Sequence, residues 1–549
     1  MTRTESSLKN LVTALVGQAA GILISFIARR AFLDCLDEEY LGISGLFTNI
    51  LTVLSLAELG VGTAMTFALY KPLAENDTPA VQALMRFYSR AYNAIGVIIL
   101  LLSVLFIPIY PLFMEEVPDI PHLTAIYLLY AANTGVSYFF SYKRTLIICD
   151  QKKYVATVYR YVFFFLMNAA QIAVLYATKN YLLFTAAQLV FTVAENIAVS
   201  RCADKMYPYL REKTEYTVPE KTYLEIKQNI KAMMMHKIGG MVVFSTDNIL
   251  ISKLIGLTAT GIYSNYYLIT SALEKITLQL FTSISAGVGN LNAVDTDKTA
   301  LKKSFYRVFF LNFWVMGFCF VCLVNLFNPF ICLWLKTDRL VFDGFTVVLI
   351  SAVFYLTGIR RTVLTFREAA GAFWYDRYKP VIEAAVNLIT SVLLAKAMGV
   401  SGIFLGTVIS TVTVCIWVEP CVLFRHVFGG SPKKYFGRLI LYTAVTAIAC
   451  MLTHFLCGLI TFGGLFGFVL RVVICLAVPN LLFFLLFGSR ILSCTFLLSG
   501  VRTSRFICCR CCIVFLFKSF YFIFKFFFSN LEFSYIIAAI YILFFLFIE

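Results

Sequence analysis

Charged residues are scarce in this sequence. Only 14% of its 549 residues are charged, whereas 60% are hydrophobic, and the mean hydropathy is +0.83. A soluble domain carries about 25% charged and about 45–50% apolar residues. This shortage of charge excludes an ordinary soluble protein. Because backbone polar groups in lipid must be hydrogen-bonded within the chain, the composition predicts an all-α polytopic membrane protein.

Nucleotide and metal motifs are missing as well. No G-x-x-x-x-G-K-S/T stretch is present, so we do not expect ATP to drive the protein directly. The 16 cysteines form no spaced set in a hydrophilic loop that would indicate a disulfide framework. Neither Cys319 with Cys322 nor the group near residue 510 has the ligand spacing of a tetrahedral zinc site. We therefore expect no metal, no cofactor and no catalytic residue.

Long apolar runs fill most of the chain. At about 20 residues a crossing, they predict about fourteen membrane spans. These lie near 10–33, 41–70, 91–114, 122–142, 154–177, 181–200, 232–252, 259–290, 308–327, 343–365, 381–398, 402–424, 439–460 and 466–488. The first run lacks a small-x-small cleavage site, which favours a span over a signal peptide. The tail 489–549 changes abruptly to a Phe- and Cys-rich composition, with room for one more helix near its end. A shifted reading frame and a lineage-specific addition are both open as its origin.

Lysine and arginine lie mainly in alternate loops. The N-terminus and the loops beginning near 71, 143, 201, 291, 366 and 425 are basic, whereas the opposite loops hold only Lys179, Lys253, Lys336 and Arg339. The positive-inside rule therefore places the N-terminus in the cytoplasm. The net charge of +16 is explained by this asymmetry, and no nucleic-acid partner is expected.

A weak internal repeat divides the chain. The pattern DT-x8-FY occurs at Asp77 and again at Asp295, and Gly21 and Gly42 match Gly240 and Gly261 at an offset of 219. An even number of spans separates the copies, so the repeat is parallel, a transporter architecture with the substrate path between the halves. The predicted organisation is an N-terminal six-helix lobe (1–200), a cytoplasmic linker (201–231), a second six-helix lobe (232–424), two additional helices (425–488) and the tail (489–549).

Ionisable groups inside the spans are the candidate functional residues, because each costs a few kcal/mol to insert. Helical spacing puts Gln18 and Arg29 on one face of the first span, with Arg30 beside them. In the seventh span it puts His236 in line with Asp247, and Lys237 in line with Asn248. Other candidates are Glu58, Arg360, Arg361 and Glu383. Arginine suits a phosphate because its planar fork bonds two oxygens at once.

Most of these groups also have an explanation that involves no function. Arg360 and Arg361 lie near a predicted span end and could snorkel to the surface, and so could Arg29 and Arg30. The pair at 236 and 237 could be interfacial. Glu58 and Asp247 are harder to explain in this way, because a short carboxylate cannot reach either surface from that depth.

Two stretches carry a resemblance to a known family. "FLDCLDEEYLGISGLFTNILTVLSLAELGVGTAMTFALYKPLAENDT" and "HKIGGMVVFSTDNILISKLIGLTATGIYSNYYLI" resemble Wzx-type oligosaccharide flippases, the polysaccharide transporter family of the MOP exporter superfamily. The resemblance implies two six-helix lobes in a MATE-like V around a cationic cavity, in the bacterial cytoplasmic membrane. It also implies a substrate, an oligosaccharide unit on undecaprenyl diphosphate, and partners, the polysaccharide polymerase and chain-length machinery. The sugar does not carry over.

The functional hypothesis is flipping of that lipid-linked unit by alternating access, with proton or sodium coupling. Substrate contacts are then expected from Arg29, Arg30, Gln18, Lys237, Asn248, Arg360 and Arg361. Ion coupling is expected from Glu58, Asp247, His236 and Glu383.

Three rivals stay open. A MATE-like drug or cation antiporter would favour an acidic cavity over intramembrane arginine. A membrane polysaccharide polymerase or ligase would need a long extracytoplasmic loop with acid/base groups, and the longest such loop, near 328–342, is short and holds no histidine. A scaffold without transport would not need buried charge.

Overall fold

The protein is described from a computed structural model, which covers residues 3–58, 60–212, 216, 218–220, 222–224, 226–228, 230, 246–294, 298–370, 374–376 and 378–496. Within these ranges the regular structure is helical and no strand occurs, which confirms the predicted all-α class. Several predicted features lie outside the described residues, namely His236, Lys237, Gly240, Asp295, Thr296 and the tail after residue 496.

The helices lie along the predicted spans, although two of these spans, 41–70 and 402–424, are each divided. They are α1 (Arg3–Cys35), α2 (Glu38–Leu54), α3 (Val61–Glu75), α4 (Thr78–Leu105), α5 (Leu123–Cys149), α6 (Lys153–Thr178), α7 (Tyr181–Met206), α9 (Leu257–Val294), α10 (Lys298–Leu335), α11 (Gly344–Ala369), α12 (Lys379–Met398), α13 (Val400–Ser410), α14 (Ile416–Val422), α15 (Lys433–Gly458) and α16 (Gly464–Phe496). Residues 246–254 are also helical. Ten helices among the described residues are long and apolar enough to cross a membrane, so a total of fourteen stays a prediction.

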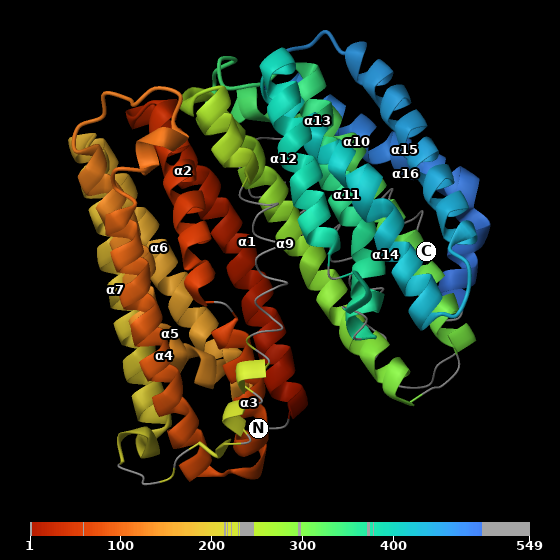
Figure 1. Ribbon diagram of the computed structural model, residues 1–549. Coiled ribbons are helices and arrows are strands. Elements are labelled where there is room, and N and C mark those ends of the chain that lie inside the picture. The colour runs from red at the N-terminus through yellow and green to blue at the C-terminus, as the bar shows by residue number, and fades with distance from the viewer. Residues whose placement is uncertain are drawn as a thin grey trace.

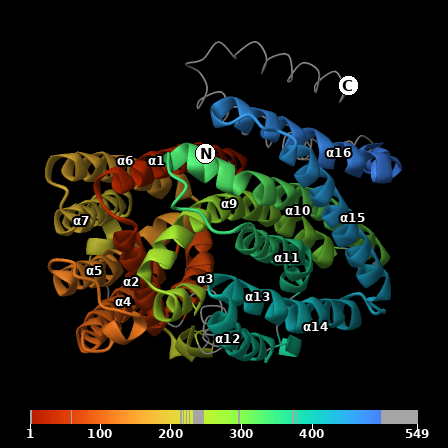
Figure 2. The same ribbon diagram turned by 90° about the horizontal axis from the view of Figure 1, so that it is seen from above.

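The helices gather into two bundles (Figure 1). The first bundle is formed by α1–α7, and the second by α9–α14 with the helical residues 246–254. α15 and α16 pack on α10, outside the second bundle (Figure 2). Aromatic contacts fix this attachment, since the rings of Phe313 on α10 and Tyr442 on α15 stack with centroids 4.2 Å apart. The predicted lobe boundaries remain predictions.

The two bundles meet along α2 and α9, at the end of the molecule opposite the N-terminus. A Cβ added to Gly42 would lie 2.2 Å from the carbonyl oxygen of Leu257, and one added to Gly261 would lie 2.0 Å from that of Glu38. Each glycine thus lets the backbone of the other bundle approach. We call this reciprocal contact the seam. Both glycines and both carbonyls differ by the repeat offset of 219, so equivalent positions face each other as in an isologous interface.

The second predicted span is broken rather than continuous. α2 ends in a single 3-10 turn, η1 (Ser55–Glu58), and α3 begins after Gly60, whose φ of +83° is left-handed and therefore suits glycine. The break puts Glu58 at a discontinuity between two helices. Irregular backbone at membrane depth is tolerated only where protein or a water-filled cavity surrounds it.

The repeated DT motif has a local role at its first copy. Asp77 is the N-cap of α4, and its side chain accepts a hydrogen bond of 3.0 Å from the backbone N–H of Ala80. One aromatic residue of each copy is also structural, at different positions of the motif: Tyr88 in the first copy and Phe305 in the second are fully buried core residues of their bundles.

Candidate functional site

Arg29 lies where the two bundles meet. Its Nη1 donates to Ser264 Oγ at 2.6 Å and to Asn265 Oδ1 at 3.5 Å, both on α9. The side chain is half-buried, and within the described part of the chain its hydrogen-bond acceptors are neutral. A guanidinium held by neutral groups keeps its full charge for an anion.

Arg30 reaches α10 from the next position on α1. Its Nη1 donates to the carbonyl oxygen of Trp334 at 2.6 Å, and its Nε lies 3.8 Å from Asp34. The ring of Phe26 packs edge-on against Trp334 at 4.8 Å. The two predicted arginines are therefore brought together beside the seam, and each binds a different helix of the second bundle.

Asp247 forms a polar cluster inside the second bundle. The hydroxyl of Thr407 lies 3.2 and 3.4 Å from the two carboxylate oxygens, and Asn387 Nδ2 donates to Thr407 Oγ1 at 2.9 Å. Asn387 and Thr407 are buried. The cluster therefore links the Asp247 carboxylate through one threonine hydroxyl to a buried asparagine of α12.

Four charges form a second, compact cluster nearby. Arg360 on α11 binds Glu419 on α14 through two hydrogen bonds, of 3.0 Å from Nε and 2.6 Å from Nη2. Lys379 Nζ lies 2.7 Å from Glu419 and 2.8 Å from Glu383, and Arg360 lies 3.8 Å from Glu383. Two cations thus face two carboxylates, and Glu419 is fully buried.

Arg360 was predicted to bind the substrate, but in this charge cluster its guanidinium is paired with carboxylates of the second bundle. The snorkelling alternative is wrong for this residue, because its guanidinium is buried against Glu419 and not extended to a surface. The cluster also connects to Asp247, since Glu383 and Asn387 stand one turn apart on α12. α14 lies between two π-helical turns, η5 (Thr411–Cys415) and η6 (Leu423–Val427), a distortion that often accompanies functional sites.

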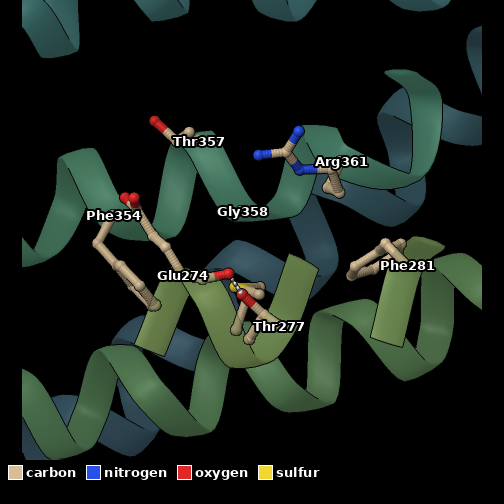
Figure 3. A pocket seen from close by; sticks show the side chains of 8 residues that line it. Glu274, Thr277, Phe281, Phe354, Thr357, Gly358 and Arg361 are labelled. Carbon is tan, nitrogen blue, oxygen red and sulfur yellow. Dashed lines mark hydrogen bonds between the residues drawn. The ribbon is translucent and has the colours of Figure 1, made fainter. Parts of the chain in front are cut away.

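Arg361 faces a different neighbour. Figure 3 shows it on α11, with Glu274 of α9 lining the same space. The cavity between them is about 20 Å³, close to the volume that holds a single water. Arg361 therefore belongs to a contact between helices in this conformation, and the space is too small for a substrate group.

Glu58 lines a larger cavity in the first bundle, which is open to its surroundings and not enclosed. The cavity is about 420 Å³, and Tyr92 on α4 donates a hydrogen bond of 2.8 Å to Glu58 Oε1. Glu58 Oε1 also lies 2.7 Å from the position of a Cβ on Gly62, so the carboxylate sits over the first turn of α3. The positive end of a helix dipole favours an anion there.

The remaining predicted residues are less engaged. Gln18 accepts a hydrogen bond of 3.5 Å from the Tyr161 hydroxyl, and Asn248 is half-buried beside Asp247. No group of three or more His, Cys, Asp or Glu side chains able to hold a metal occurs in the described ranges.

Three charged partners were missed by sequence reasoning, and one of them, Lys379, stands one turn before Glu383 on α12. Glu419 could have been noticed as a carboxylate inside the apolar run 402–424, next to Pro420. Arg144 pairs with Glu195 at 2.5 Å, between α5 and α7, although the polar loop that follows α5 made it read as a topology residue.

No protein-family model and no curated protein sequence matches the chain. Solved structures do. The lipid II flippase MurJ in an inward closed conformation aligns with a TM-score of 0.62 and 15% identity over 88% of this chain and 99% of that chain. An inward-facing multidrug resistance MATE family transporter of the MOP superfamily aligns with a TM-score of 0.53 and 12% identity over 74% of this chain and 94% of that chain. A mutant of the Vibrio cholerae MATE transporter VcmN aligns with a TM-score of 0.51 and 12% identity, over 78% and 99%. At such identities the likeness establishes the fold, which is that of MOP-superfamily transporters in a multi-pass membrane protein.

Proposed function

We propose that this chain, with the fold of the MOP-superfamily transporters, flips a lipid-linked oligosaccharide across a bacterial cytoplasmic membrane. The substrate is an oligosaccharide unit on undecaprenyl diphosphate, destined for surface polysaccharide. The N-terminus is cytoplasmic, and the polymerase and chain-length machinery act next. The name of one structural neighbour, a lipid II flippase, supports a lipid-linked substrate.

The observation that carries the proposal is the position of Arg29. It is a half-buried cation at the junction of the two bundles, held by a serine and an asparagine from α9. Groups that bridge two bodies change their contacts when the bodies rock, so a diphosphate that replaces Ser264 as the partner of Arg29 would loosen the junction. Arg30, the next residue of α1, supplies a second guanidinium that contacts α10 and lies 3.8 Å from Asp34. A ligand shifts such an equilibrium only through this kind of differential contact.

Ion coupling is proposed for Asp247 with Thr407 and Asn387. Protonation of a carboxylate, or cation binding by it, changes the charge that the second bundle must hold. Glu383, one turn from Asn387, transmits the change to the charge cluster of Arg360, Lys379 and Glu419.

A complementation experiment tests the function. The chain is expressed in a flippase-deficient strain, and both surface polysaccharide and the lipid-linked units retained in the membrane are measured. We expect Arg29→Ala to lose most of the surface polysaccharide while lipid-linked units accumulate, and Arg29→Lys to recover part, since lysine keeps the charge but not the fork.

Arg339→Ala is the matched control, because Arg339 is an exposed arginine on the predicted extracytoplasmic side. Normal polysaccharide from Arg29→Ala at equal expression would overturn the role of Arg29. Failure of the wild-type chain, combined with export of an organic cation dye, would favour the antiporter instead.

A further inference from the structure

The cavity beside Glu58 is lined entirely by residues that carry a polar group. They are Glu58, Tyr92, Asn133, Thr134, Ser137, Tyr138, Ser141 and Thr145. Ligand pockets are usually lined mainly by apolar side chains, with only a few polar groups. A membrane protein that is 60% hydrophobic makes such a lining more unusual still. Its volume of about 420 Å³ falls within the range of small-molecule sites.

One face of α5 supplies most of this lining. Asn133, Ser137 and Ser141 recur every four residues, so they lie above one another along the helix. The hydroxyl of Ser137 donates to the carbonyl oxygen of Asn133 at 2.8 Å, and that of Thr145 to the carbonyl of Ser141 at 3.3 Å. The Ser137 oxygen also accepts from Asn196 Nδ2 at 3.5 Å, and the Thr145 oxygen lies 3.2 Å from the Tyr88 hydroxyl, so this face of α5 forms a connected polar network.

An unsatisfied acceptor points to a missing partner. Asn133 Oδ1 is buried and has no hydrogen-bond partner among the residues that the structure describes. A buried polar atom without a partner is costly unless a ligand or water satisfies it. Asn133 therefore contributes to the lining an amide whose oxygen lacks a donor among the described residues.

The lining selects the class of that group. It contains one carboxylate and no lysine, arginine or histidine, so it offers no positive charge to a phosphate. Hydroxyl, amide and carboxylate oxygens match the hydroxyl groups of a sugar, which both donate and accept. The rings of Tyr92 and Tyr138, with centroids 5.6 Å apart, add an apolar surface for the carbon skeleton of such a ligand.

The place in the fold agrees with a substrate site. The cavity adjoins the break between α2 and α3, where Glu58 and Gly60 interrupt the second span. Discontinuous membrane helices are typical of the substrate sites of transporters. The arginines at the seam are not part of this lining. The residues that would bind the charged part of the substrate are therefore different from those that would bind its sugar part.

We infer that this cavity binds the uncharged sugar part of the lipid-linked substrate, apart from the arginines that bind its diphosphate. The inference rests on the proposed function. It makes the sugar contribution to affinity separable from the phosphate contribution.

Two lipids test the inference on the purified full-length chain. One is undecaprenyl diphosphate, and the other is the same lipid carrying the oligosaccharide extracted from membranes of the source organism. The variants are Asn133→Leu and Thr134→Val, which keep the side-chain size and remove polar atoms. Thr157→Val on α6, outside the cavity lining, is the matched control, and thermal unfolding in detergent verifies that each variant is folded.

We expect each cavity variant to weaken binding of the sugar-bearing lipid by about tenfold, the effect of one hydrogen bond of ordinary strength, and to leave binding of the bare lipid unchanged. Arg29→Ala should weaken both lipids. An unchanged ratio of the two affinities in both cavity variants would overturn the sugar assignment. Weaker binding of tetraphenylphosphonium with that unchanged ratio would identify a cation site. If wild type binds neither lipid, the proposed function itself fails.

Discussion

The seam between the bundles allows a quantitative prediction. The perturbations are Gly42→Ala, Gly261→Ala and the double variant. An ordinary contact of a Cβ begins near 3.4 Å, so the backbones must separate by about 1.2 Å to admit a methyl group at Gly42 and by about 1.4 Å at Gly261. The neighbouring atoms at both places are backbone carbonyls, which cannot rotate away as a side chain would.

Overpacking of a close contact costs about 1–3 kcal/mol. If each single substitution destabilises the closed state by that amount relative to the open state, the equilibrium between closed and open seam shifts by about 5–150-fold. The two clashes are not independent, because a single separation of about 1.4 Å removes both. The double variant is therefore expected to cost little more than Gly261→Ala alone, a clear failure of additivity.

Hydrogen exchange of the Glu115 amide measures this opening. Its N–H donates to the carbonyl oxygen of Ser252 at 3.2 Å, across the same junction, so its protection depends on closure. Gly437→Ala is the control. Gly437 is a helical glycine with no atom within 4 Å of an added Cβ, so it gains the helix propensity of alanine without a clash.

We expect protection of the Glu115 amide to fall in the three seam variants and not in the control. Unchanged protection in both single variants would refute the reasoning. So would a double variant whose loss equals the product of the two single losses, because the glycines would then not share one gap.

Three further predictions concern charge. Glu419→Gln leaves two cations facing one carboxylate and should destabilise the folded protein by about 3–5 kcal/mol in thermal unfolding. As a control, Glu75→Gln in an exposed helical ion pair should cost less than about 0.5 kcal/mol. Equal effects of the two substitutions would contradict the buried cluster. Arg144→Glu should be unstable and regain much of its stability when combined with Glu195→Arg, which a double-mutant cycle measures; no recovery would show that the pair is not coupled. Partial burial would raise the pKa of Asp343, but hydrogen bonds from the side chain and backbone of Thr346 outweigh this effect and lower that pKa. The stability that this N-cap contributes is therefore complete at neutral pH and is lost as pH falls below the ordinary range of an aspartate. Asp343→Asn should lose this acid sensitivity in unfolding scans, and an unchanged pH profile would contradict the prediction.

Depth in the membrane was enough to predict that two carboxylates, Glu58 and Asp247, have polar surroundings. Glu58 and Asp247 were predicted because a short acid far inside an apolar run has no surface to reach, and the structure gives each a polar environment: a tyrosine hydroxyl for Glu58, and a threonine hydroxyl for Asp247. What these acids do in transport stays a prediction.

The partner of a buried charge could not be found in the same way. Helical periodicity tells which residues share a face of one helix, but not which other helix that face meets. Arg360 and Glu419 are 59 residues apart on different helices, and only packing brings the guanidinium onto the carboxylate. The lining of the Glu58 cavity likewise joins the break after α2 to α4 and to one face of α5.

The amino-acid sequence by itself determined that this protein is a helical multi-pass membrane protein, because apolar runs and internally satisfied backbones leave lipid as the solvent. It also contained the offset that relates Gly42 to Gly261. Only the tertiary structure decided that each of these two glycines lies against the backbone of the other bundle. It also decided that Arg29 of α1 binds α9 and that Glu58 lines a polar cavity. The physical reason is that these contacts depend on the distance between helices, which the packing of whole faces sets and no single segment encodes.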